Sequence, residues 1–173
     1  MVIVLMGYMG SGKSVLGNDL AYALQFEFID LDAYIESREG KNISAIFKDD
    51  GELYFRRAES KYLAEILNDR TKVVLALGGG TPCYGTNLNL IKSSQNTISI
   101  YLKATIETLL TRLSDETAKR PLVAHLDTQD ERREFIGKHL FERSGFYQQA
   151  DITLETDKQT VEDSIENIIF QLF

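Results

Sequence analysis

The segment GYMGSGKS, residues 7–14, places three glycines, a lysine and a serine directly behind the apolar run VIVLM of residues 2–6. It fits the pattern G-x-x-x-x-G-K-[ST], and it stands between a strand-like run and a helical segment, as that pattern requires. Backbone N–H groups of such a loop converge on phosphate oxygens, and glycine lets the backbone come that close. The following helix points its positive dipole end at the same anion. The segment therefore predicts a loop that holds a nucleoside triphosphate.

The residue types within this loop indicate separate tasks. Lys13 is expected to reach the β- and γ-phosphates of ATP, and the Ser14 hydroxyl is expected to bind Mg²⁺. Gly17, one turn later, is expected to let the helix pack closely on the sheet. A glycine-rich turn with a solvent lysine is the alternative, but the full pattern in this context favours nucleotide binding. The candidate ATP-binding residues of the loop are Gly10, Ser11, Gly12, Lys13, Ser14 and Val15.

Two carboxylates follow the second apolar run, in the segment FEFIDLD of residues 26–32. Positions two apart in an extended chain point to one side, so Asp30 and Asp32 would both face the γ-phosphate. Two carboxylates suit two tasks: one would contact a metal-bound water, and the other would contact the hydroxyl group that accepts the phosphate. A structural role is the alternative, because Asp32 would serve equally well as the cap of a helix that starts at Ala33. From the residues alone, both the chemical role and the capping role of Asp32 remain open.

Composition and charge exclude several classes of protein. The chain has 173 residues, 43 % of them hydrophobic and 26 % charged, which suits one globular domain spanning residues 1–173. The net charge is −7 without a basic stripe, so we expect no nucleic-acid partner. No apolar run approaches the ~20 residues that span a bilayer, and no secretory pattern opens the chain. With a single cysteine, Cys83, a reducing cytoplasm and no membrane partner are expected.

Short apolar runs alternate with segments of helical period, which predicts an α/β fold. We expect the three-layer P-loop NTPase arrangement, a five-stranded parallel sheet with helices on both faces. The expected strands are residues 2–6, 26–29, 72–77, 97–102 and 151–154, and the expected helices are residues 13–24, 52–67, 106–113, 131–147 and 161–172.

Two stretches interrupt this alternation. Residues 33–61 hold extra helical material between the second and third strands. Residues 115–130 are polar, contain Pro121, and are typical of a mobile loop. Both are expected beyond the carboxyl ends of the strands, where such sheets bind their ligands.

Glycines and arginines recur after the phosphate loop. Gly78, Gly79 and Gly80 end the third apolar run, where backbone amides would meet a ligand. Arg56 lies in GELYFRRAE with Phe47 and Phe55 nearby, Arg120 in AKRPL, and Arg143 in FERSGFY. A single helical arginine is more often solvated or ion-paired. Because the chain is acidic, a set of arginines beside a phosphate loop is more informative than any one of them.

This ordered series resembles shikimate kinase over nearly the whole chain. The matching motifs are the phosphate loop with its trailing Gly17, DLD at residues 30–32, FRR-x-E at residues 55–59, LGGG, RPL and the late Arg143. The phosphate loop alone would be unspecific, but the series at this length is specific. The resemblance implies a fold like that of nucleoside monophosphate kinases and ATP-dependent phosphorylation of the 3-hydroxyl of shikimate. It also implies Mg²⁺, a place in aromatic amino acid biosynthesis, and a monomer.

The resemblance further implies roles for single residues. Asp32 would hold the acceptor hydroxyl, and Arg56 and Arg143 would bind the acceptor carboxylate with the Gly79 backbone, since guanidinium groups grip carboxylates bidentately. Asp30 would act on Mg²⁺ through a water, and Arg120 would swing toward the phosphates on a lid of residues 115–130. Phe47, Phe55 and Glu59 would shape the acceptor pocket within residues 33–61. The implied catalytic residues are Asp32, Lys13 and Arg120, the substrate-binding residues Asp32, Arg56, Gly78, Gly79, Gly80 and Arg143, and the metal site Ser14 with Asp30.

The sequence also departs from the family pattern. Gly145 stands where the family often has proline, and the loop ETDKQT of residues 155–160 is less basic than is common. Arg112 and Lys158 are therefore only candidates for adenine contacts. Tyr8, inside the phosphate loop, is expected to face solvent or the acceptor-binding segment.

Two other functions are alternatives for a chain with this phosphate loop. Another small-molecule P-loop kinase, of the gluconate or nucleoside monophosphate type, would differ within residues 33–61, and the pair of arginines favours a carboxylate acceptor instead. A nucleotide-dependent switch would carry an N-K-x-D motif and a D-x-x-G motif after the third strand, and the sequence has LGGG there.

Overall fold

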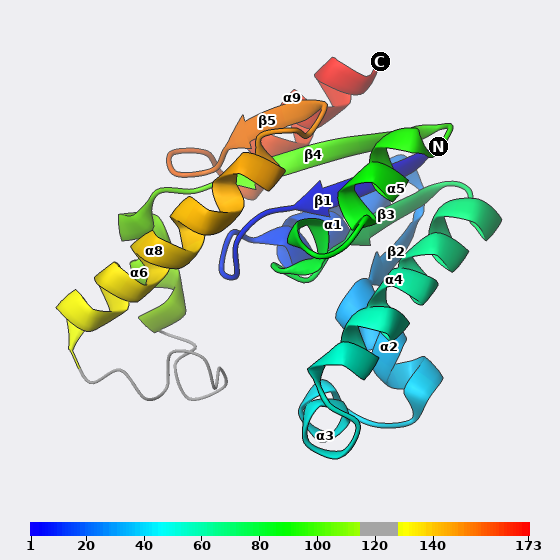
Figure 1. Cartoon of the computed structure of the whole chain (residues 1–173). Coiled ribbons are helices and arrows are strands. Elements are labelled where there is room, and N and C mark those ends of the chain that lie inside the picture. The colour runs from blue at the N-terminus through cyan, green and yellow to red at the C-terminus, as the bar shows by residue number, and fades with distance from the viewer. Residues whose placement is uncertain (115–127) are drawn as a thin grey trace.

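The computed structural model describes residues 1–114 and 128–173, and its centre is a parallel sheet (Figure 1). The strands lie in the order β2-β3-β1-β4-β5, and every neighbouring pair is parallel. The five-stranded parallel sheet expected from the sequence is confirmed. The strands are β1 (Val2–Met6), β2 (Glu27–Asp30), β3 (Val73–Ala76), β4 (Thr97–Lys103) and β5 (Ile152–Glu155).

Helices connect these strands, and their bounds differ from the expected ones by two residues or fewer. One helix begins earlier than expected: α8 starts at Gln129 because Thr128 caps it and Glu131 completes a capping box. The described helices are α1 (Lys13–Leu24), α2 (Leu31–Glu39), α3 (Ile43–Asp49), α4 (Glu52–Asp69), the 3₁₀ turn η1 (Thr81–Cys83), α5 (Asn87–Ser93), α6 (Ile106–Ser114), α8 (Gln129–Tyr147) and α9 (Val161–Leu172).

Helices cover both faces of the sheet, which explains why its strands are apolar throughout. Along β1, Val2, Val4 and Met6 pack into one hydrophobic core, and Ile3 and Leu5 pack into a second. The first core includes residues of α2, α4, α5, α6 and α8, and the second those of α1 and α9. Because successive strand residues point to opposite faces, all five side chains of β1 are buried.

The close packing of α1 on the sheet depends on Gly17. A Cβ atom at this position would lie 2.6 Å from the Phe28 ring and 3.1 Å from a methyl group of Leu5. Neither gap would hold a methyl group without displacing the helix. The expected role of Gly17 is therefore confirmed, and α1 keeps the phosphate loop close to the end of β1.

Residues 33–61 form the extra helical layer that the sequence predicted. They comprise most of α2, the whole of α3 and the first half of α4, and α4 contacts both of the shorter helices. Of the interrupting stretch 115–130, residues 115–127 lie outside the described part of the chain, and Gln129 and Asp130 already belong to α8. Within the described residues, no helix is both long and apolar enough to cross a bilayer.

Candidate active site

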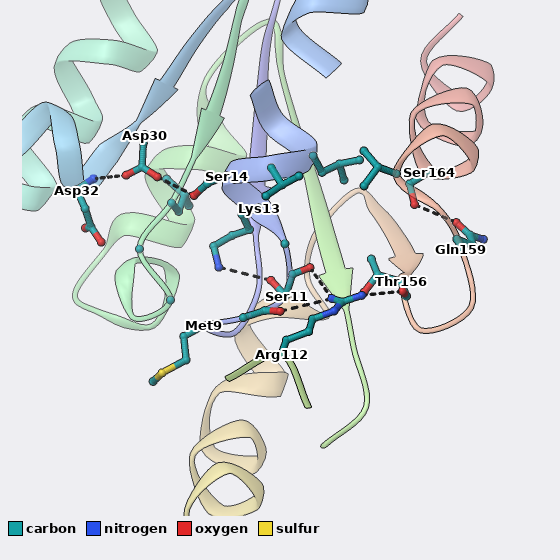
Figure 2. A pocket seen from close by; sticks show the side chains of 18 of the residues that line it. Met9, Ser11, Lys13, Ser14, Asp30, Asp32, Arg112, Thr156, Gln159 and Ser164 are labelled. Atoms are coloured by element: carbon teal, nitrogen blue, oxygen red, sulfur yellow. Dashed lines mark hydrogen bonds between the residues drawn. The ribbon is translucent and has the colours of Figure 1, made fainter. Parts of the chain in front are cut away.

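The phosphate loop lies between β1 and α1 and lines a pocket of about 610 Å³ (Figure 2). Gly12 is the N-cap of α1 with a φ of 95°, a left-handed conformation that glycine adopts without strain. The loop therefore closes tightly and turns the N-terminus of α1 toward the pocket. All six loop residues predicted to bind ATP line this pocket: Gly10, Ser11, Gly12, Lys13, Ser14 and Val15.

Lys13 is the first residue of α1, and its side chain folds back over the loop. Its Nζ atom donates to the carbonyl oxygens of Gly7 and Tyr8, at 2.9 Å each. Only 9 % of the residue is exposed. The alternative of a solvent lysine is therefore wrong, because the ammonium group is held inside the loop where phosphate oxygens would lie.

Ser14 and Asp30 form the predicted metal-binding pair. The Ser14 hydroxyl donates to Asp30 Oδ2 at 2.9 Å, and both residues line the pocket. Asp30 Oδ1 accepts the backbone N–H groups of Asp32 and Ala33, so Asp30 is the N-cap of α2. A hydroxyl beside a carboxylate is a donor set that suits Mg²⁺. The residues present therefore fit such an ion.

The position of Asp32 differs from the expectation in two ways. The strand ends at Asp30, so Asp32 lies in the first turn of α2 and not in extended chain. The capping role considered for Asp32 belongs to Asp30 instead, which leaves the Asp32 carboxylate facing the pocket. Both acids still line the pocket, as the sequence predicted.

The environment of Asp32 raises its pKa to about 6. Burial is the main cause, and the negative charges of Asp30 and Glu59 add to it. Lys13 opposes the shift but does not cancel it. Asp32 is nevertheless mainly ionised at neutral pH, because a carboxyl group with a pKa of about 6 has lost most of its protons by pH 7.

The three glycines after β3 lie close to three side chains predicted to belong to the site, one glycine for each. A Cβ atom at Gly78 would lie 3.0 Å from Asp32 Oδ1, and one at Gly80 would lie 3.1 Å from Arg56 Nη2. The corresponding atom at Gly79 would lie 3.7 Å from Arg143 Nη1. Side chains here would displace Asp32 or Arg56, so the glycines allow both groups to approach the same stretch of backbone.

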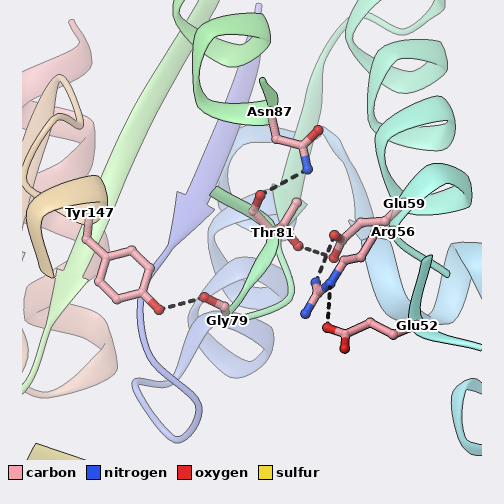
Figure 3. Close-up of polar contacts among 7 residues, drawn as sticks. All are labelled: Glu52, Arg56, Glu59, Gly79, Thr81, Asn87 and Tyr147. Atoms are coloured by element: carbon pink, nitrogen blue, oxygen red, sulfur yellow. Dashed lines mark hydrogen bonds and ion pairs between the residues drawn. The ribbon is translucent and has the colours of Figure 1, made fainter. Parts of the chain in front are cut away.

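Arg56 lies on α4 and is held by acidic partners (Figure 3). Its Nη1 atom donates to Glu59 Oε2 at 3.0 Å, and its Nε atom lies 3.7 Å from Glu52 Oε1. The guanidinium group also lies over the rings of Phe55 and Tyr84. Phe47 packs against Phe55 with ring centroids 4.7 Å apart. The predicted neighbours of Arg56 are thus gathered around it.

Arg143 lies near the end of α8 and has a different environment. It makes no ion pair with any residue the structure describes, and its guanidinium carbon lies 5.8 Å from the centroid of the Tyr8 ring. Tyr8 is only 1 % exposed, so the expectation that it would face solvent is wrong. Its ring is buried against α8, where its hydroxyl lies 3.4 Å from His139 Nδ1. Neither Arg56 nor Arg143 lines the pocket of the phosphate loop, but each lies close to one of the glycines after β3.

The far end of the pocket brings Arg112, one of the two candidates for adenine contacts, together with the segment after β5. Arg112 donates to the carbonyl oxygens of Gly10, Ser11 and Thr156, which links the phosphate loop to the segment after β5 (Figure 2). Lys158, the other candidate for adenine contacts, does not line the pocket. The position of this segment directly after the last strand was the one signal in the sequence that it would contribute to the pocket. The pocket-lining residues here are Thr156, Gln159, Thr160, Val161 and Ser164.

Two predicted features have no structural description. Arg120 and the lid residues 115–127 lie outside the described part of the chain. The predicted role of Arg120 therefore stays a prediction.

The sheet order, the phosphate loop and the acids after β2 together define a P-loop nucleotide-dependent kinase. The shikimate kinase family model matches residues 9–173, and the chain belongs to this family. Shikimate kinase of Flavobacterium johnsoniae is 42 % identical over 167 residues, which cover 96 % of both chains. Shikimate kinase of Legionella pneumophila is also 42 % identical, over 99 % of this chain and 94 % of its own length.

Solved structures agree with this assignment. Shikimate kinase from Bacteroides thetaiotaomicron superposes with a TM-score of 0.90 at 33 % identity and covers 99 % of this chain and 98 % of its own. Shikimate kinase from Acinetobacter baumannii, solved in complex with shikimate, gives a TM-score of 0.86 at 32 % identity, over 99 % of this chain and 92 % of its own.

Proposed function

We propose that this chain transfers the γ-phosphoryl group of ATP to the 3-hydroxyl of shikimate, giving shikimate 3-phosphate and ADP in aromatic amino acid biosynthesis. One observation carries the proposal. Asp32, Arg56 and Arg143 meet at Gly78 to Gly80, directly beside the phosphate loop. A carboxylate bound between the two arginines would place a ring hydroxyl near Asp32. Membership of the shikimate kinase family supports the same acceptor.

The phosphate side is supported by the loop and its lysine. Backbone N–H groups of the loop and the N-terminus of α1 would hold the phosphates, and Lys13 would turn from the Gly7 and Tyr8 carbonyl oxygens toward them. Mg²⁺ would neutralise charge on the β- and γ-phosphates when bound. Ser14 and Asp30 would hold that ion, Asp30 through a water.

The acceptor side requires orientation and a proton acceptor. Asp32 would accept a hydrogen bond from the 3-hydroxyl and take its proton as the bond to phosphorus forms. Arg56 and Arg143 would fix the ring through its carboxylate, so that the hydroxyl points at the γ-phosphate. In phosphoryl transfer the protein forms no covalent bond to the substrates, so this alignment would account for much of the catalysis together with stabilisation of the phosphate charge.

The charge of the acceptor site favours a monocarboxylate over a phosphate monoester. Arg56 is already balanced by Glu59, and Arg143 has no acidic partner among the described residues. One uncompensated positive charge suits an acceptor with one negative charge. A nucleoside monophosphate carries close to two negative charges at neutral pH. The nucleoside monophosphate kinase alternative is therefore disfavoured on electrostatic grounds.

We also propose that the enzyme acts as a cytoplasmic monomer. The single cysteine, Cys83, is unpaired, which suits a reducing compartment. A molecular mass from sedimentation equal to that of one chain would support the monomer. A mass equal to that of two chains would contradict it.

An ATP-consumption assay on the purified chain tests the function. ADP formation is expected with shikimate, and only background with gluconate, with AMP or without acceptor. Asp32→Asn, which keeps the shape of the side chain, serves as the inactive control. Turnover of gluconate or AMP at rates equal to that of shikimate would overturn the proposal.

A further inference from the structure

A buried chain of hydrogen bonds joins α5, the 3₁₀ turn η1 and α4, and the proposed chemistry does not use it (Figure 3). Asn87 Nδ2 donates to the Thr81 carbonyl oxygen at 3.0 Å. The Thr81 hydroxyl donates to Glu59 Oε1 at 2.6 Å. Glu59 Oε2 in turn accepts from Arg56 Nη1 at 3.0 Å. The chain therefore ends on a guanidinium group of the acceptor site.

Burial makes this arrangement specific. Thr81 is 0 % exposed, and Glu59 and Asn87 are 1 % exposed each. Water cannot replace a lost partner at such positions, so each donor matters more than it would at the surface. With one partner on each oxygen, the Glu59 carboxylate is held in a single orientation, and it fixes the guanidinium group of Arg56 in turn.

Thr81 also belongs to the glycine turn. Its backbone N–H donates to the Gly78 carbonyl oxygen at 3.1 Å, and it directly follows Gly80, whose α-carbon lies against the Arg56 guanidinium group. One residue thus holds the turn through its backbone and orients the arginine through Glu59. The glycine turn follows β3 and the arginine lies on α4, so Thr81 fixes the position of one segment relative to the other.

We propose that Thr81 is a positioning residue of the acceptor site, which acts on Arg56 through Glu59 and is itself held by Asn87. The inference rests on the proposed function, in which Arg56 binds the acceptor carboxylate. A residue that only stabilised the fold would change the melting temperature but would not change the shikimate KM relative to the ATP KM. A positioning residue changes the acceptor KM selectively.

Thr81→Val removes the hydroxyl at nearly constant volume, and Thr81→Ser keeps it. With the valine variant, the shikimate KM is expected to rise roughly 5- to 10-fold, less than the loss of a direct hydrogen bond to a charged group would cause, because Thr81 acts on Arg56 through Glu59. The ATP KM should change less than about 2-fold, and the serine variant should return the shikimate KM to near wild type. Thr86→Val, at an exposed threonine whose side chain makes no capping hydrogen bond to α5, is the matched control. If the valine variant does not fold, Thr81→Ala removes the same hydroxyl.

A double-mutant cycle with Glu59→Gln tests the route of the effect. If Thr81 acts through Glu59, adding Thr81→Val to Glu59→Gln should raise the shikimate KM by less than about 2-fold more. If the fold-changes in shikimate KM caused by Thr81→Val and Glu59→Gln multiply in the double variant, the two residues act independently and the proposal is overturned. An unchanged shikimate KM in a folded Thr81→Val variant would also overturn it. Those results leave the proposed function intact, because wild-type turnover of shikimate is measured in the same assay. A wild-type chain that does not turn over shikimate would overturn both.

Discussion

The Tyr147 hydroxyl donates to the carbonyl oxygen of Gly79 at 2.6 Å and ties the end of α8 to the glycine turn (Figure 3). Tyr147 is fully buried, and burial raises the pKa of its phenol well above the usual value, so it remains a donor at physiological pH. Arg143 lies one turn earlier on the same helix. The bond therefore sets the distance between the Gly79 backbone and Arg143, the two groups proposed to share one carboxylate.

Tyr147→Phe should loosen this connection without removing the ring. We expect the free energy of unfolding to fall by about 1 kcal/mol, because one hydrogen bond is lost and a carbonyl oxygen is left without its partner. The shikimate KM should rise, and the ATP KM should stay unchanged. Chemical denaturation and steady-state kinetics measure both effects. Tyr22→Phe, at a residue 88 % exposed, is the control and should change neither.

Lys13→Met should remove most activity. The expected loss in kcat is roughly 10²–10³-fold, the usual effect of deleting one group that stabilises transition-state charge. Methionine keeps the length of the side chain, which matters because Lys13 is buried over the loop. Lys92→Met, on an exposed face of α5, is the matched control. A folded Lys13→Met variant with normal kcat would rule out the kinase assignment.

Arg56→Ala and Arg143→Ala should both raise the shikimate KM, each by the equivalent of about 1.5–3 kcal/mol, and leave the ATP KM less affected. Their effects on stability should differ. Arg56→Ala leaves the buried Glu59 without its cation, which is expected to cost on the order of 3 kcal/mol of unfolding free energy. Arg143 has no acidic partner among the described residues, so its removal should cost much less. Equal losses of stability would contradict the assigned environments.

Asp32→Asn should lower kcat roughly 10²–10⁴-fold, the range for a positioned general base. In the wild type, kcat/KM should fall as the pH drops below about 6, because the pKa of Asp32 is raised to about 6 and the protonated form cannot accept the hydroxyl proton. A pH profile of kcat/KM that stays flat down to about pH 5 would remove Asp32 from this role.

The same substitution should stabilise the fold at neutral pH. The folded-state pKa of Asp32 lies above its unfolded value, so the folded protein binds the proton more tightly and stability falls as the pH rises through about 4 to 6. Asparagine has no such penalty. Asp32→Asn should therefore be more stable than the wild type above about pH 6, on the order of 2 kcal/mol, and the difference should vanish toward about pH 4. Melting curves across this range measure it, and a helix-capping role would instead give a loss of stability.

Local chemistry accounts for what the sequence alone determined about this protein. The phosphate loop, the expected strands and the start of α1 at Lys13 follow from motif and periodicity, which depend on near neighbours in the chain. The close contact at Gly17 was also foreseeable, because a glycine one turn into a helix has few other purposes.

Tertiary structure decided the relations between distant segments. The capping role considered for Asp32 falls to Asp30 because the strand ends and α2 begins at that point, a boundary that propensity does not fix. Tyr8 is buried because α8, more than a hundred residues later, packs over it. The acidic charges of Asp30 and Glu59 outweigh Lys13 at Asp32, and their separations exist only in the folded chain. The link from Thr81 through Glu59 to Arg56 likewise joins elements whose spacing no sequence pattern encodes, because burial and distance are properties of the packed core.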